Sequence, residues 1–361
     1  MKKSLIISYN YPPVVGGIET YAFELIKYFD SNFKDYYEFI YNKTLKPLSG
    51  IYRGVSFVIF ILRTLLRIIF KKYDVIHITN FNLWFIGFIY SLIHRQTKIV
   101  LNLWGLELVY KSKKGILPII YNFLVPINLI SNLSSFEFMV SSNASKDLAT
   151  KNGFNERKLH YIPLGTRIFN VENKFNASEE YVFFAGRITP RKGLNWFVHN
   201  VLNEFPDLKL KFVGPIVDRK EYENIMKSKQ VEYLGVVSEK DLIKLRHGSL
   251  AVIIPNTKDK ENPDFEAFCF VTIESVASKA IVLASNYQGL SDSLLNGILG
   301  FLAEPSDKES WVQKLKEVLA IEKEERNIII EDRLEILKQK FMWQKIFEDT
   351  YQLHRKLIEK K

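Results

Sequence analysis

The sequence predicts an α/β protein built from two parallel β-sheets, each in a domain of its own. Short apolar runs typical of buried strands alternate with helical patterns along the whole chain, and that order favours parallel strands joined by helical crossovers. The length of 361 residues is enough for two domains with sizeable cores. Residues 168–180 are polar and lack periodicity, which predicts a linker. We therefore expect one domain over residues 1–168 and a second over residues 169–340.

In the first half of the chain, apolar runs that predict strands alternate with helical patterns. Strands are expected at residues 4–8, 74–79, 98–103 and 136–141. Helices are expected at residues 18–29, 51–72 and 81–94, and from residue 143 onward, with Ser142 or Asn143 as the N-cap.

The second half repeats this order. Strands are expected at residues 181–185, 209–213, 231–239, 250–255 and 281–284. Helices are expected after Gly193, from Glu274 to about Lys279, over residues 311–319 and from residue 341 onward.

Charge is distributed unevenly along the chain. The net charge is +10, yet residues 1–170 hold 21 Lys and Arg against 10 Asp and Glu, a difference of +11. The first half should therefore face something anionic, such as a membrane surface, nucleic acid or a phosphorylated substrate. Only about five apolar residues follow Lys2 and Lys3, too few for a signal peptide. The single cysteine, Cys269, excludes an internal disulfide and suits a reducing compartment.

Two glutamates, Glu266 and Glu274, stand eight positions apart with a mostly apolar spacer. The pattern places the first on a loop and the second near the start of a helix, with backbone amides of residues 269–272 between them. A carboxylate there can accept hydrogen bonds from sugar hydroxyls, and free amides at a helix start suit a phosphate. The alternative is an ordinary acidic loop followed by a glutamate that complements the helix dipole.

Basic residues stand between a predicted strand and a predicted helix. Arg187 and Lys192 follow the strand at 181–185. The planar fork of an arginine and the compact charge of a lysine both suit a diphosphate, although such residues are more often solvated surface. Gly16 and Gly17 also lie between a strand and a helix, an arrangement that accepts phosphate but that tight turns use too.

These stretches resemble the retaining glycosyltransferases of family 4 (glycosyl transferases group 1). The match rests on the two glutamates, on the Gly186–Gly193 element and on a Gly-Gly loop near the N-terminus. The resemblance implies a GT-B fold, with two Rossmann-like domains facing a central cleft and a C-terminal helix over residues 341–361 that crosses back to the N-terminal domain.

The resemblance also implies roles for single residues. Glu274 would hold the nucleotide ribose and Glu266 the transferred sugar, while Arg187 and Lys192 would hold the diphosphate. The remaining donor-binding positions would be Gly16, Gly17, Gly186, Gly214, Val237, Phe268, Cys269, Phe270 and Val271. The chain departs from the family at several points, with Ala267, Cys269 and Lys279 for glycines, Ile281 for a proline and Trp104 for a histidine near the donor sugar.

Two stretches of the first half suggest contact with a membrane or an acceptor. Residues 51–72 form an amphipathic pattern with Arg63, Arg67 and Lys71 in one stripe; the alternative is a surface helix whose apolar side packs on the sheet. A second basic cluster, Lys111, Lys113 and Lys114, precedes an uncharged segment over residues 115–136. Its prolines and asparagines favour an interfacial or buried segment over a regular membrane span.

Taken together, the residues and the resemblance predict a metal-independent hexosyltransferase that retains anomeric configuration. The co-substrate would be a nucleotide-diphosphate sugar, with a UDP-sugar favoured, and no other cofactor is expected, since the chain has no Asp-x-Asp motif. The acceptor would be a glycan or a lipid-linked glycan of lipopolysaccharide or other surface-polysaccharide biosynthesis. The expected location is the cytoplasm, peripheral to the inner face of the cell membrane.

Three other functions stay open on the sequence. GT-B folds also host nucleotide-sugar epimerases, which need acid–base groups in the cleft. A non-catalytic membrane-docking homologue with a decayed site is supported by Trp104 and the altered loop glycines. Nucleic-acid binding rests on charge alone, without a recognised motif, so we expect no nucleic-acid partner.

Overall fold

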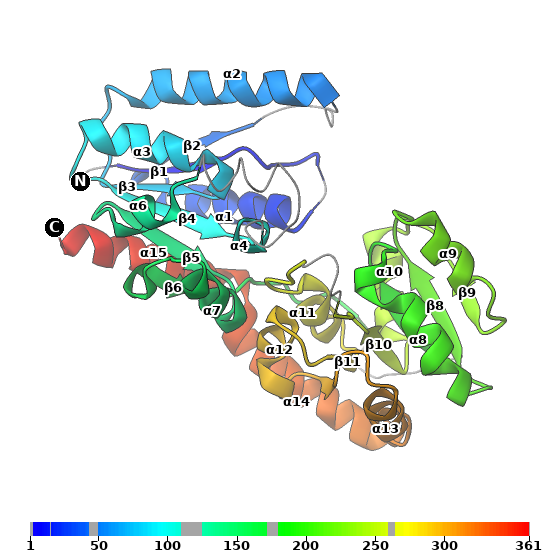
Figure 1. The fold of residues 1–361 in the computed structure, drawn as a ribbon. Helices are drawn as coiled ribbons and strands as arrows, with labels where there is room; N and C mark the ends of the chain where they lie inside the picture. The colour runs from blue at the N-terminus through cyan, green and yellow to red at the C-terminus, as the bar shows by residue number, and fades with distance from the viewer. Residues whose placement is uncertain are drawn as a thin grey trace. The chain divides into compact units, whose positions relative to one another are not determined.

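The computed structural model describes residues 3–14, 16–42, 50–109, 125–171, 180–258 and 264–360. The chain divides into two compact units (Figure 1). The first unit consists of Met1–Leu164 together with Trp343–Lys361, and the second consists of Gly165–Met342. Each unit is an α/β structure with its own sheet.

The first unit contains a six-stranded sheet with the order β2-β1-β3-β4-β5-β6, and every pair of neighbours is parallel. Its strands are β1 (Ser4–Ser8), β2 (Tyr37–Tyr41), β3 (Val75–Ile78), β4 (Lys98–Leu103), β5 (Phe136–Val140) and β6 (Leu159–Tyr161). Strands β1, β3, β4 and β5 are buried along their length, as expected for a parallel sheet covered on both faces.

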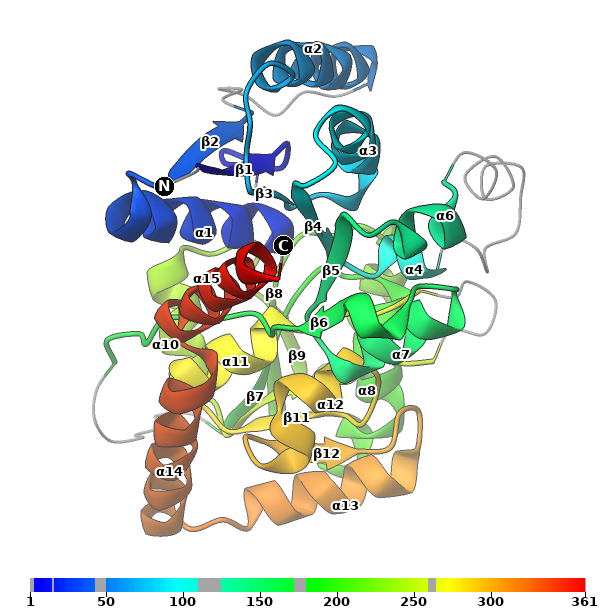
Figure 2. The ribbon, with the colours of Figure 1, turned by 90° about the vertical axis from the view of Figure 1, so that its left-hand side faces the viewer.

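Helices cover both faces of this sheet. Its helices are α1 (Gly17–Phe33), α2 (Gly50–Ile68), α3 (Trp84–Ile93), α4 (Leu106–Val109), α6 (Ile127–Asn132), α7 (Asn143–Lys151) and α15 (Trp343–Glu359). Figure 2 shows α1 and α15 side by side on one face and α2 with α3 on the other. The C-terminal helix α15 is tied to the unit by a hydrogen bond of 2.9 Å between His354 Nδ1 and the Tyr37 hydroxyl.

The second unit repeats this plan with the parallel order β12-β11-β10-β7-β8-β9. Its strands are β7 (Tyr181–Ala185), β8 (Lys209–Val213), β9 (Val231–Tyr233), β10 (Ala251–Ile254), β11 (Val282–Ser285) and β12 (Phe301–Ala303). Its helices are α8 (Leu194–Asn200), α9 (Arg219–Ile225), α10 (Glu239–His247), α11 (Phe270–Ala277), α12 (Gly289–Ser293), α13 (Lys308–Leu319) and α14 (Lys323–Phe341). The fully buried indole of Trp311 packs edge-on against Phe197, with ring centroids 5.6 Å apart, at the centre of its core.

The structure confirms the predicted alternation of strands and helices, but three of the predicted elements have different bounds. Helix α11 begins at Phe270 rather than near Glu274, so Glu274 lies a full turn inside the helix. The strand predicted over 231–239 ends at Tyr233, because Gly235 adopts a φ of +76° that breaks the extended run. The final helix, predicted from residue 341, is α15 and begins at Trp343; the extended residue Met342 separates it from α14, which the sequence analysis did not predict.

Three predicted features fall wholly or partly outside the described residues. The basic cluster of Lys111, Lys113 and Lys114 lies outside them, as do most of the linker and the first part of the 115–136 segment. Within the described ranges, no helix combines the length and the apolar character needed to cross a membrane.

Candidate functional site

The candidate site lies at the carboxyl ends of β7 and β10 in the second unit. From β7 the chain runs outward through β8 and β9, and from β10 it runs the other way through β11 and β12. Neighbouring strands whose connections leave in opposite directions mark the point where ligands bind in open parallel sheets. The loop after β7 carries Gly186, Arg187 and Lys192, and the loop after β10 carries Asn256.

Glu266 is the centre of a compact hydrogen-bonded cluster at this edge. Its Oε2 atom accepts from Arg191 Nη1 at 2.5 Å, from Lys192 Nζ at 2.6 Å and from Asn256 Nδ2 at 3.0 Å. Arg191 Nε lies 3.0 Å from the Asp264 carboxylate, so it bridges two acids. Among the described residues, the contacts to the Glu266 carboxylate all go to Oε2, so Oε1 can accept from a ligand.

The electrostatics of the cluster fix the charge of Glu266. Burial alone would raise the pKa of this carboxyl, but the charges of Lys192 and Arg191 and their hydrogen bonds lower the pKa to about 2. Opposite charges at hydrogen-bond distance favour the ionised form in this way. Glu266 is therefore a fixed anion at neutral pH, able to accept hydrogen bonds but not to donate a proton.

Two glycines allow the backbone to close around the site. Gly193 has a φ of +69°, and a Cβ there would stand 1.8 Å from the carbonyl oxygen of Pro255. Gly214 has a φ of +131°, and a Cβ there would stand 2.0 Å from the carbonyl oxygen of Gly186. Only glycine fits a left-handed conformation with such close backbone contact. The loops after β7, β8 and β10 can meet because these two side chains are absent.

A second carboxylate, Glu274, is held by a residue that the sequence analysis missed. Arg246 Nη2, from α10, donates to Glu274 Oε2 at 2.7 Å. The Arg246 side chain is only 3% exposed, whereas that of Glu274 is 30% exposed. A buried arginine therefore fixes a carboxylate that still reaches solvent. No pattern around residue 246 links it to Glu274, because the two lie 28 residues apart on different helices.

The structure separates the two predicted phosphate-binding residues. Lys192 joins the Glu266 cluster, whereas Arg187 is exposed and makes no hydrogen bond or ion pair with the described residues. Arg191 and Asn256, which the sequence analysis also missed, take part in the cluster instead. The signal in the sequence that pointed to Arg191 was its position directly before Lys192.

The predicted residues at the start of α11 are mostly packed inside the unit. Phe268 and Cys269 are buried, and the Phe268 ring lies 5.9 Å from that of Phe341. Burial raises the pKa of the Cys269 thiol to about 11, so it is neutral at physiological pH. Phe270 and Val271 are partly exposed, as is Val237 after β9.

In the first unit, the predicted Gly-Gly loop lies directly before α1. Gly16 is the N-cap of α1, and Gly17 is the first residue of the helix. The Trp104 indole donates to the Thr79 carbonyl at 2.6 Å, and the Trp104 backbone amide donates to the Glu107 carboxylate. Burial raises the pKa of Glu107 to about 7, so this carboxyl is a titratable group that the sequence analysis did not single out.

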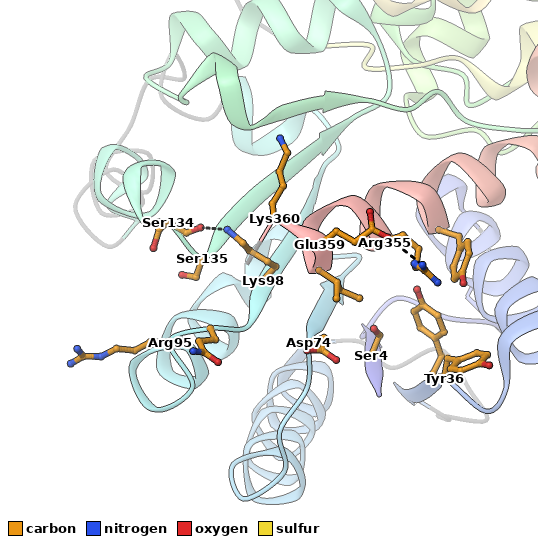
Figure 3. A pocket seen from close by; sticks show the side chains of 14 residues that line it. Ser4, Tyr36, Asp74, Arg95, Lys98, Ser134, Ser135, Arg355, Glu359 and Lys360 are labelled. Atoms are coloured by element: carbon orange, nitrogen blue, oxygen red, sulfur yellow. Dashed lines mark hydrogen bonds and ion pairs between the residues drawn. The ribbon is translucent and has the colours of Figure 1, made fainter. Parts of the chain in front are cut away.

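A hollow of about 740 Å³ lies at the opposite, amino-terminal edge of the first sheet (Figure 3). Asp74, Lys98 and Ser134 line it, and the Lys98 ammonium donates to the Ser134 carbonyl at 2.8 Å. Parallel sheets bind ligands at their carboxyl ends, so the hollow is not part of the candidate site. Among the residues described, no group of three or more His, Cys, Asp or Glu is placed to hold a metal ion.

Comparison with known proteins identifies chains that resemble this one. Residues 166–334 match the family model described as Glycosyl transferases group 1. Sucrose-phosphate synthase from Thermosynechococcus elongatus is 16% identical with a TM-score of 0.79, and each chain is covered in full. Anabaena HepE, solved in complex with UDP and glucose, is 18% identical with a TM-score of 0.70 over 98% of this chain and 99% of HepE.

The fold is GT-B. Among curated proteins, the lipopolysaccharide 1,2-N-acetylglucosaminetransferase of Salmonella typhimurium is 29% identical over 49% of this chain and 49% of its own length. The chain spans about half the length of that relative. The Glycosyl transferases group 1 match covers the strands and loops that carry Glu266, Lys192 and Glu274.

The cluster predicts how stability depends on Glu266. The change Glu266→Gln should lower the free energy of unfolding at pH 7 by on the order of 3 kcal/mol, because it leaves two partly buried cations without their anion. Chemical denaturation measures this. The pKa of Glu266 is lowered from 4.5 to about 2, so its contribution is full above the unfolded value and fades as the pH falls toward the folded value.

Between pH 4.5 and about pH 2, the free energy of unfolding of the wild type should therefore fall more than that of Glu266→Gln. Glu335→Gln, which removes an exposed carboxylate on α14, is the matched control and should change stability by under about 0.5 kcal/mol. If Glu266→Gln and Glu335→Gln lowered the free energy of unfolding equally, this would contradict a stabilising role for the Glu266 cluster.

Proposed function

We propose that the protein is a retaining glycosyltransferase that uses a nucleotide-diphosphate sugar, with UDP as the favoured nucleotide. The observation that carries the proposal is the ionised Glu266, fixed by Arg191, Lys192 and Asn256 at the carboxyl ends of β7 and β10. The Glycosyl transferases group 1 match over this region supports it. The complex of HepE with UDP and glucose supports the choice of nucleotide.

In this proposal, the donor diphosphate binds beside the loop that follows β7. Arg187 is exposed and unpaired among the described residues, so its guanidinium is available to a phosphate. Lys192 donates one of its three N–H groups to Glu266, which leaves two for phosphate oxygens. These cations would offset the charge that develops on the leaving diphosphate.

The two glutamates would hold the sugar and the nucleoside. Glu266 presents Oε1 to hydroxyls of the transferred sugar, since the contacts of its carboxylate with the described residues all go to Oε2. Glu274 presents Oε1 to the ribose, since Arg246 donates to Oε2. Arg246 is thus a positioning residue, which acts on the nucleotide only through Glu274.

The pairing of Glu266 with two cations favours front-face substitution. A double displacement needs a free carboxylate nucleophile beneath the anomeric carbon. The low pKa of Glu266, caused by its two cationic neighbours, makes it a weak nucleophile and a hydrogen-bond acceptor. We propose that the leaving phosphate accepts the proton of the acceptor hydroxyl, so that the new bond forms on the face from which the nucleotide departs.

We further propose that the acceptor is a glycan or a lipid-linked glycan of lipopolysaccharide or another surface polysaccharide. The relative in Salmonella typhimurium is a lipopolysaccharide 1,2-N-acetylglucosaminetransferase, and the excess positive charge of the first half suits an anionic acceptor. The proposed location is the cytoplasmic face of the cell membrane, where nucleotide sugars and lipid-linked acceptors meet. We propose no nucleic-acid partner.

One observation favours a second candidate, a nucleotide-sugar epimerase. The buried Glu107 has a pKa of about 7, which suits an acid–base group. Incubating the donor alone separates the two functions. An epimerase converts the donor sugar without an acceptor, whereas a transferase leaves its configuration unchanged.

Nucleotide binding tests the proposed diphosphate site. Arg187→Ala and Lys192→Ala should each weaken UDP binding by about 1.5–3 kcal/mol, the usual loss for a charge-assisted contact. Isothermal titration calorimetry measures the affinity, and Arg219→Ala, at an exposed position of α9, should leave it unchanged. If both variants bound UDP with the wild-type affinity, this would contradict the proposed diphosphate site.

A double-mutant cycle tests the positioning role of Arg246. Glu274→Gln should weaken UDP binding about tenfold, and Arg246→Gln should also weaken it because the carboxylate loses its fixed orientation. The double variant should bind no more weakly than Glu274→Gln alone, while Glu266→Gln should chiefly lower turnover or change sugar preference. Additive losses for Arg246 and Glu274 would show that Arg246 acts independently.

Metal dependence gives a further test. We expect sugar transfer to continue in excess chelator, because Arg187 and Lys192 are proposed to meet the charge of the leaving group. A transfer assay with and without EDTA measures this. Loss of activity that magnesium or manganese restores would count against the proposal.

A further inference from the structure

The helix α2 turns its apolar side away from the protein. Its inward side carries Phe60, Thr64 and Ile68, which are 8%, 1% and 0% exposed. The opposite side carries Leu62 and Leu66, which are 56% and 74% exposed. With about 100° between successive residues, these two sets lie on opposite faces of the helix. The helix therefore packs on its unit through Phe60, Thr64 and Ile68, and the side that carries Leu62 and Leu66 faces outward.

We call the exposed set the outward stripe. It runs the length of the helix and one turn beyond it, and its members are Tyr52, Val55, Val58, Ile59, Leu62, Leu66 and Phe70. In Figures 1 and 2, α2 is the outermost helix of its unit, and none of the described elements of that unit covers its far side. The neighbouring α3 extends the apolar surface with exposed Ile89, Leu92 and Ile93.

Cations border the outward stripe. Arg63 and Arg67 lie one turn apart on exposed positions of α2, and neither has a hydrogen bond or ion pair among the described residues. Both line a groove of about 660 Å³ between α2 and the end of β2, and no acidic residue lines it. Lys71 differs from the sequence expectation, because its ammonium is paired with Glu38 at 2.9 Å. Among the described side chains of α2, the unpaired charge beside the outward stripe is thus that of Arg63 and Arg67.

We propose that the outward stripe inserts into the surface of an anionic phospholipid bilayer. An apolar surface of this extent marks an interaction site on a protein of this size. The bordering arginines complement lipid phosphates, and α2 contains no Asp or Glu to oppose them. A second copy of the chain fits less well, because two such faces would bring four arginines together without a counter-charge.

The proposed contact is a helix lying in the plane of the interface. The 19 residues of α2 extend over roughly 28 Å, so the stripe can sink between headgroups along its whole length. The arginine side chains would reach back to the phosphates while their stems stay with the apolar layer. Apolar insertion, rather than charge alone, is therefore the main contribution to binding.

This inference extends the proposed location of the enzyme, but it depends on neither donor nor acceptor. Failure of the vesicle experiment would leave the proposed transfer reaction standing, and failure of sugar transfer would leave membrane insertion standing.

Vesicle flotation of the full chain tests the proposal. The wild type should float with vesicles of equal parts phosphatidylcholine and phosphatidylglycerol, and salt should release only part of it. The change Leu62→Ser with Leu66→Ser should lower the bound fraction at least about tenfold. The matched control, Ile298→Ser with Ile328→Ser, alters two similarly exposed residues of the second unit and should bind as the wild type does.

Fluorescence distinguishes insertion from adsorption by charge. The indole of a Leu66→Trp variant should shift to shorter emission wavelengths on vesicles and should be quenched by brominated lipid. Arg63→Gln with Arg67→Gln should weaken binding only a few-fold, and only to anionic vesicles.

Three results would overturn the proposal. The first is an unchanged bound fraction in the leucine double variant. The second is complete loss of binding in the arginine variant alone. The third is a wild type that stays off vesicles and sediments as a dimer, with the leucine double variant sedimenting as a monomer.

Discussion

The ion cluster around Glu266 is the interaction on which the proposed donor site of the second unit depends. A carboxylate at a sheet edge would ordinarily be solvated and mobile, but here Arg191, Lys192 and Asn256 hold one of its oxygens. The cost of removing this carboxylate from water is offset by two cations at hydrogen-bond distance. Its charge and position are thereby set before any ligand arrives, which is what electrostatic preorganisation requires.

The fold makes that cluster possible by bringing together loops that are far apart in sequence. Lys192 and Glu266 are 74 residues apart, and they meet because β7 and β10 are neighbours whose connections leave in opposite directions. The glycines at 193 and 214 then let three loops approach backbone to backbone. The strand order, together with the absence of side chains at Gly193 and Gly214, therefore positions the residues of the site.

The sequence predicted the inner parallel strands well, because buried strands are continuous apolar runs whose signal is local. It did not predict β2, β6 and β12, which lie at the edges of the two sheets. It also predicted Glu266, Glu274 and Lys192 as site residues, since they lie within recognisable motifs. Arg246 and Asn256 were not predicted, because their importance comes only from which carboxylate each contacts in the folded chain. The direction of the outward stripe on α2 was likewise open, since an amphipathic pattern does not show which side faces the sheet.

The central claim is that the fixed carboxylate of Glu266 receives the donor sugar beside a cationic diphosphate site. A crystal structure of the protein with a non-hydrolysable UDP-sugar tests this most directly. The account predicts the diphosphate against Arg187 and Lys192, the ribose at Glu274, and a sugar hydroxyl within hydrogen-bond distance of Glu266 Oε1. A donor bound away from the carboxyl ends of β7 and β10, or a sugar that makes no contact with Glu266, would contradict it.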